Sequence, residues 1–140
     1  MTLRNFRFII LFSLSLFVYK HSFSQQTGDL IGDWKVTKVE MASTADPKEK
    51  QALVLVEPIF LKSIFHFKTD SLFSYDSPDE GFAVESANWH FDEKEKKVSV
   101  TRKISTGSPG ILMGITVKKE EGNYLFLMEG TPLLLYVKKN

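Results

Sequence analysis

Most of the chain after residue 30 alternates apolar and polar residues with a period of two, which is the pattern of half-buried β-strands. Turn-forming residues separate these segments at hairpin spacing. Strands are expected at Trp34–Met41, Ser63–Thr69, Leu72–Asp76, Phe82–Phe91, Val98–Ile104, Ile111–Lys119, Tyr124–Met128 and Leu133–Lys138. About eight short strands in this order predict an all-β protein, an antiparallel barrel or sandwich, and we favour an up-and-down β-barrel.

One segment breaks the alternation and has the signals of a helix. Asp46 is a good N-cap, Pro47 follows at the first helical position, and Glu49 completes a capping box. The sequence therefore predicts one helix between the first and second strands, within residues 46–62. Pro58 is expected to end or kink it near residue 56. Its apolar residues Leu53, Val54 and Val56 should then lie against one end of the barrel.

The first 24 residues have the three-part pattern of a secretory signal peptide. Arg4 and Arg7 give a positive start, Phe8–Val18 is an apolar run with serines, and Ser22 and Ser24 stand at the −3 and −1 positions of a cleavage site. A membrane-spanning helix, the alternative, needs about 20 apolar residues. We expect a signal peptide over residues 1–24, cleaved before Gln25, and one domain over residues 25–140. The mature protein would be periplasmic or extracellular, soluble and without a stable membrane span.

Composition excludes some classes of function. The chain has 18 lysines and arginines against 17 acidic residues, and loss of Arg4, Arg7 and Lys20 with the signal would change the net charge from +1 to −2. Such a balance argues against a nucleic-acid partner, which calls for a basic surface. There is no cysteine, so stability must come from a packed core and a hydrogen-bonded sheet rather than from disulfides.

Metal and catalytic chemistry find little support in the sequence. His66 and His90 could form a zinc pair with Glu85 or Asp70 as a third ligand, but isolated strand histidines are more often surface residues, so no metal site is expected. The acidic segment Asp76–Gly81 lacks the spacing of a calcium loop and has the composition of a turn.

The remaining glycines and serines also suggest structure rather than catalysis. Ser105–Gly110 has neither a nucleophile elbow nor a phosphate-binding loop, so we expect a flexible connection near the mouth of the barrel. Gly114, inside an apolar strand, predicts a bulge or a close backbone approach. No Ser/His/Asp arrangement or carboxylate pair can be assembled. We therefore expect no enzymatic activity and no cofactor.

Gly32-Asp33-Trp34, at the head of the first strand, resembles the Gly-x-Trp opening of lipocalin-like barrels. The order of the later segments is similar to that of small lipocalin-like domains exported by bacteria. The similar features are an aromatic hairpin (Phe65, Phe67, Phe73, Tyr75), a central strand with Trp89 and Phe91, and a last strand ending in Tyr136 and Lys138. The resemblance implies a barrel that can hold a small apolar ligand, and it implies no shared catalytic residue. It also implies a basic residue packed over the opening Trp, for which Lys138 is the candidate.

Two functional hypotheses follow. In the first, the barrel binds a small apolar ligand among its inward aromatic residues, with Tyr75 and Tyr124 as polar groups. The interior candidates are Trp34, Phe65, Phe67, Tyr75, Trp89, Tyr124 and Phe126. In the second, side chains fill the barrel, and its loops bind a protein or envelope component, as an inhibitor, immunity factor or assembly module would. An apolar cavity of several hundred Å³ would favour the first hypothesis.

Overall fold

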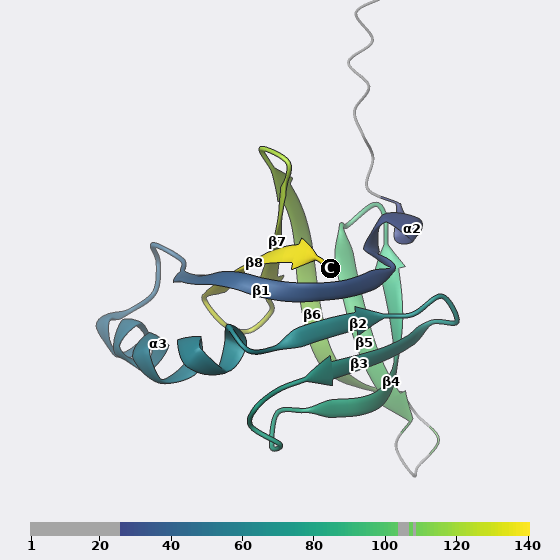
Figure 1. Ribbon diagram of the computed structural model, residues 1–140, viewed down its shortest axis with the longest axis horizontal. Coiled ribbons are helices and arrows are strands. Elements are labelled where there is room, and N and C mark those ends of the chain that lie inside the picture. The colour runs from purple at the N-terminus through teal and green to yellow at the C-terminus, as the bar shows by residue number, and fades with distance from the viewer. Residues whose placement is uncertain (1–25, 104–106, 108) are drawn as a thin grey trace, which may run out of the picture.

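A computed structural model describes residues 26–103, 107 and 109–140, which form a closed eight-stranded antiparallel β-barrel (Figure 1). The elements are α2 (Thr27–Leu30), β1 (Gly32–Met41), α3 (Pro47–Phe60), β2 (Ile64–Phe67), β3 (Leu72–Asp76), β4 (Val84–Asp92), β5 (Lys97–Lys103), β6 (Pro109–Glu120), β7 (Asn123–Met128) and β8 (Leu133–Lys139). The predicted fold class, including the helix after the first strand, is confirmed.

Each strand pairs with the next one in the chain, and β8 pairs with β1 to close the barrel. Near one end of this last pair Met41 stands opposite Leu133, and near the other end Trp34 stands opposite Lys139. The register shifts between Val36 and Lys38, where β1 bulges. Because no strand edge is left open, the ladder hydrogen bonds of every strand have a partner strand on both sides.

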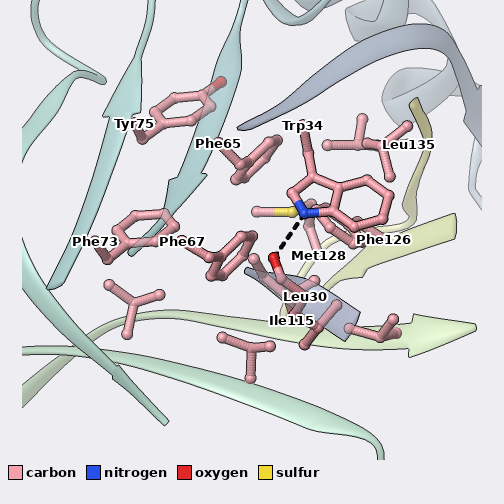
Figure 2. Packing of buried hydrophobic residues seen from close by; sticks show 14 of the residues in the cluster. Leu30, Trp34, Phe65, Phe67, Phe73, Tyr75, Ile115, Phe126, Met128 and Leu135 are labelled. Carbon is pink, nitrogen blue, oxygen red and sulfur yellow. Dashed lines mark hydrogen bonds between the residues drawn. The ribbon is translucent and has the colours of Figure 1, made fainter. Parts of the chain in front are cut away.

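The alternating residues that predicted the strands also form the core, because every second side chain of a barrel strand points inward. The central interior is filled by side chains that are almost completely buried, namely Val36, Phe65, Phe67, Phe73, Val98, Val100, Ile115, Val117, Phe126 and Leu135. Several of the aromatic rings contact one another edge to face (Figure 2). The middle of the barrel is therefore solid.

Helix α3 begins as the sequence predicts. Asp46 caps it, accepting a hydrogen bond from the Glu49 backbone N–H at 2.8 Å, while the Glu49 carboxylate accepts the Asp46 N–H. Of the two outcomes predicted near residue 56, an end or a kink, the end is wrong, because the helix continues through Pro58 to Phe60. The residues beyond the proline pack on the barrel: Phe60 and Leu61 contact the core cluster, which offsets the cost of the lost backbone hydrogen bond.

The predicted apolar face of α3 is also partly wrong. Leu53 and Val56 do pack against the core cluster, but Val54 is 73% exposed. In Figure 1 the helix lies beyond one end of β1, whereas α2 lies at the other. The two helices thus mark the two ends of the barrel.

The α2 end is closed by a short helix that is not among the elements predicted from the sequence. Leu30 is completely buried, and its carbonyl accepts a hydrogen bond from Trp34 Nε1 at 2.8 Å (Figure 2). Trp34 in turn packs edge-on against Tyr124, with 4.7 Å between ring centroids. Trp34 at the head of β1 and Leu30 before it therefore plug this end of the barrel.

Two expectations concern segments that are described in part or not at all. The signal peptide over residues 1–24 lies outside the described residues, as do three of the six residues of the loop expected at Ser105–Gly110, whose last two residues belong to β6. Within residues 26–103, 107 and 109–140, no helix is long and apolar enough to cross a membrane.

Candidate functional site: an apolar pocket at the α3 end

A pocket of about 340 Å³ lies where α3 faces the barrel end formed by the last residues of β3 and β7 and the first residues of β6 and β8. Its apolar wall consists of Val56, Ile59, Phe60, Tyr75, Phe82, Leu112, Met113, Met128 and Leu133. Side chains from the helix and from the strands thus enclose a space that neither would form alone. Pockets that bind small ligands usually measure about 300–1,000 Å³ and are mostly apolar, so this one falls at the small end of the range.

Few polar groups of this pocket are available to a ligand. The Thr131 hydroxyl donates to the Met128 carbonyl at 3.0 Å and accepts the Leu133 N–H at 3.2 Å. Glu129 forms an ion pair with Lys97 at 2.7 Å. Because these polar atoms already have partners inside the protein, the free surface of the pocket is chiefly hydrocarbon, and it suits an apolar molecule.

Tyr75 stands between the pocket and the filled core. Its ring centroid is 4.7 Å from that of Phe65, and Figure 2 shows its hydroxyl directed away from the phenylalanine cluster. Burial raises the pKa of the Tyr75 phenol, and a hydrogen bond with Ser63 partly opposes this. The hydroxyl therefore stays protonated at neutral pH.

Gly114 leaves room for the Glu129 side chain, which confirms the close approach predicted at this glycine. A Cβ on Gly114 would lie only 2.7 Å from Cδ of Glu129, and the Glu129 N–H donates to the Gly114 carbonyl at 2.9 Å. The carboxylate passes over the bare glycine backbone to reach Lys97 on β5. This arrangement fixes the polar rim of the pocket.

The structure separates the seven residues proposed as interior candidates. Tyr75 alone among them lines the α3-end pocket, whereas Trp34 and Tyr124 line a groove at the opposite end of the barrel. The other four, Phe65, Phe67, Trp89 and Phe126, lie in the packed core. Trp89 is fixed there by a hydrogen bond from its Nε1 to the Lys68 carbonyl at 3.0 Å.

Sequence reasoning missed most of the pocket wall. The sequence predicts Val56 on the face of the helix toward the barrel, but Ile59 and Phe60 follow Pro58, which is predicted to end or kink the helix. The predicted strand Phe82–Phe91 includes Phe82, yet this residue precedes β4 and is 61% exposed. The available signal was the run of large apolar residues that continues after Pro58, Ile-Phe-Leu, which would be costly to leave in solvent.

Lys139, rather than the predicted Lys138, lies over the opening Trp. The Lys139 ammonium is 5.1 Å from the centroid of the Trp34 ring, and it donates to the Asp29 carbonyl at 2.9 Å. Lys138 instead stands opposite Lys35 in the β1–β8 pair. The residue directly opposite Trp34 in this pair is Lys139, which also belongs to the same face of β8 as Val137 and Leu135.

The histidines do not come together as the zinc alternative required, because β3 separates the strands that hold His66 and His90. His66 instead joins three strands on the outside of the barrel. Its Nδ1 lies 2.6 Å from an oxygen of Asp33, and its Nε2 lies 2.8 Å from an oxygen of Asp76. In the described part of the chain, no cluster of three or more potential ligands could hold a metal ion.

Partial burial acts to lower the pKa of His66, but the hydrogen bonds to Asp33 and Asp76 outweigh it, so the pKa is raised. The ring is thus favoured in its charged form, in which both nitrogens donate. The other candidate ion site, the acidic segment Asp76–Gly81, is a turn: the Asp79 carboxylate accepts the Gly81 N–H at 3.0 Å. His66 and the segment Asp76–Gly81 thus have structural roles in this barrel.

Comparison with known proteins gives one point of reference. No protein-family model and no curated protein matches the chain. Among solved structures, it is similar to a crystal structure of a DUF4847 family protein from Bacteroides vulgatus ATCC 8482. The two share 16% sequence identity with a TM-score of 0.45, over 78% of this chain and 92% of the other.

Proposed function

We propose that this chain is an exported, non-catalytic, lipocalin-like barrel that binds a small apolar molecule in the pocket between α3 and the barrel end. The observation that carries the proposal is the mostly apolar pocket of about 340 Å³, the polar rim groups of which are already paired within the protein. Export rests on the pattern of residues 1–24, and the absence of catalysis on the lack of a nucleophile motif in the sequence.

The solid core would limit the size and position of such a ligand. Because Phe65, Phe67 and Phe126 fill the middle of the barrel, a ligand cannot extend far inward. It would contact Phe60 and Val56 of α3 on one side and Met128 and Leu133 on the other. Binding would therefore depend on how α3 is seated, and a helix that moved away from the barrel would open the pocket.

Binding of the neutral probe N-phenyl-1-naphthylamine to the purified protein tests this proposal. Leu112→Trp fills the pocket from its wall, and Ile111→Trp places the same side chain at a 75% exposed neighbour that does not line the pocket. Calorimetry should show binding to the wild type and to Ile111→Trp, and a loss of at least tenfold in affinity for Leu112→Trp. Equal affinity in all three proteins would contradict the proposal.

Native mass spectrometry of protein purified from its own compartment without detergent would identify the natural ligand. A mass increment that disappears on denaturation, and that Leu112→Trp lacks, would give the class of the ligand. An unliganded mass that persists after exposure to a lipid extract would argue for a filled barrel.

The second candidate function, an interaction module, is favoured by exposed apolar residues that do not line the pocket. Val54 and Leu55 of α3 are 73% and 75% exposed. Large apolar side chains gathered on a surface often mark contact with a partner. A photo-crosslinking residue introduced at Leu55 in the producing cells should then yield a discrete heavier species, and one at Lys118 on β6 should not.

A further inference from the structure

An open groove of about 760 Å³ passes over the C-terminal end of β8, at the barrel end opposite α3. Besides β8, residues of α2, of β1 and of the turn between β6 and β7 line the groove. The residues that matter for its chemistry are Asp29, Lys38, Asn123, Tyr124, Lys138 and Lys139. The groove shares no residue with the α3-end pocket.

The charge of this groove is opposite in sign to that of the domain. Three lysines and a single carboxylate line it, and two of these lysines, Lys138 and Lys139, have no carboxylate partner in the described part of the chain, whereas residues 25–140 carry a net charge of −2. The one carboxylate, Asp29, accepts a hydrogen bond from the Gln26 N–H at 3.0 Å. An anion that entered the groove would therefore meet an excess of cations.

Lys138 is the most available of these cations. In the described part of the chain its ammonium makes no hydrogen bond or ion pair, and Lys35, directly opposite on β1, makes none either. Like charges facing each other across an antiparallel pair destabilise it. By contrast, the ammonium of Lys38, on the same strand as Lys35, is paired with Glu40. An anion beside Lys138 would relieve the repulsion between Lys35 and Lys138.

Neutral donors lie close to these charges. Asn123 carries a side-chain amide, and Tyr124 carries a phenol on the adjacent residue. Partial burial raises the pKa of the Tyr124 phenol, and the negative charge of Asp29 acts in the same direction. The hydroxyl therefore remains a proton donor at neutral pH. Lysine cations combined with neutral N–H and O–H donors are suited to an oxyanion such as a phosphate.

We propose that the groove at the end of β8 binds the phosphate group of a phosphomonoester, with Lys138 as its principal cation and Lys139 and Asn123 as further donors. A phosphomonoester carries about −1.5 to −2 charges at pH 7, and in the groove it would face the two lysines that have no carboxylate partner among the described residues, Lys138 and Lys139. The group can belong to a soluble metabolite or to the headgroup of a lipid, because the two present the same chemistry.

Titration of the ¹⁵N-labelled protein with glycerol 3-phosphate, with glycerol as the blank, tests the site. The amide signals of residues 136–139 and 123–124 should shift, and Lys138→Gln should weaken binding about tenfold, the value of one charge-assisted hydrogen bond. Lys50→Gln, an exposed lysine on α3, is the matched control and should leave the affinity unchanged. Circular dichroism would confirm that both variants fold.

Sedimentation with phosphatidylcholine vesicles containing phosphatidic acid distinguishes the two sources. Binding of glycerol 3-phosphate indicates a soluble ligand. Binding to the vesicles that depends on Lys138, without binding of glycerol 3-phosphate, indicates a lipid headgroup. The proposal is overturned if neither probe binds, if Lys138→Gln binds as tightly as the wild type, or if Lys50→Gln loses as much affinity as Lys138→Gln. None of these results depends on occupancy of the α3-end pocket.

Discussion

Lys139 packs across both Gly32 and Trp34, which explains why these two residue types stand at the head of β1. The Lys139 ammonium is 5.1 Å from the centroid of the Trp34 ring. A Cβ on Gly32 would lie 3.2 Å from Cε of the same lysine, and Gly32 has φ +137°, a region that other residues rarely adopt. The glycine provides space for the lysine stem, and the tryptophan provides the face beneath its charge.

Trp34→Ala should lower the free energy of unfolding by about 3–5 kcal/mol, because it leaves a cavity at the closed end of the barrel. Trp34→Phe should cost less, since it keeps most of the packing and loses chiefly the hydrogen bond to the Leu30 carbonyl. Urea denaturation followed by circular dichroism measures both variants. An unchanged midpoint for Trp34→Ala would show that this residue does not plug the barrel.

His66→Gln should make the protein less stable in a pH-dependent way. The pKa of His66 is raised in the folded state, so its stabilising effect is fully present below its ordinary pKa of 6.5 and disappears as pH rises through the raised value. Thermal melts should therefore show a difference from the wild type at pH 5.5 that becomes smaller at pH 8.5. His90→Gln serves as the control, and a difference that is constant with pH would contradict the role of Asp33 and Asp76.

Asp46→Ala should destabilise α3 by about 1 kcal/mol, the usual cost of losing an N-cap. The carboxylate accepts the Glu49 N–H, which would have no partner in the variant. Hydrogen exchange of the α3 amides should accelerate relative to the wild type, while exchange in β7 should not. Asp46→Asn, which can still accept that hydrogen bond, should behave like the wild type.

The helix shows how far local signals extend. Asp46, Pro47 and Glu49 predicted its start because a capping box is a short-range arrangement that needs only neighbouring residues. Its end depends on contacts with the barrel that hold Ile59 and Phe60 in place after Pro58, and such contacts are not visible in a local pattern. The same distinction separates the barrel, which the strand alternation predicted, from the pocket, which it did not.

Gly114→Ala should change overall stability by less than about 1 kcal/mol, because the group that it displaces is the end of a flexible, half-exposed side chain. Its clearer effect should be on the ion pair between Lys97 and Glu129. A double-mutant cycle with Lys97→Ala and Glu129→Ala should give a smaller coupling energy in the Gly114→Ala background. Equal coupling in both backgrounds would mean that the carboxylate does not need the bare glycine.

Register is the other property that the sequence left open. Lys138 and Lys139 are both plausible partners for Trp34 when only the order of the strands is known. The register of the β1–β8 pair, which a bulge shifts between Val36 and Lys38, places Lys139 opposite Trp34 and Lys138 opposite Lys35. The proposed phosphate groove therefore depends on a strand register with no evident signal in the sequence.

The pairing of β1 with β8 has a consequence for how the chain is made. This seam joins residues that are 92 to 105 positions apart, and such distant contacts form late and slowly. In a nascent chain from which β8 is still missing, β1 and β7 have unpaired edges. The barrel therefore stays unclosed until β8 is available to pair with β1.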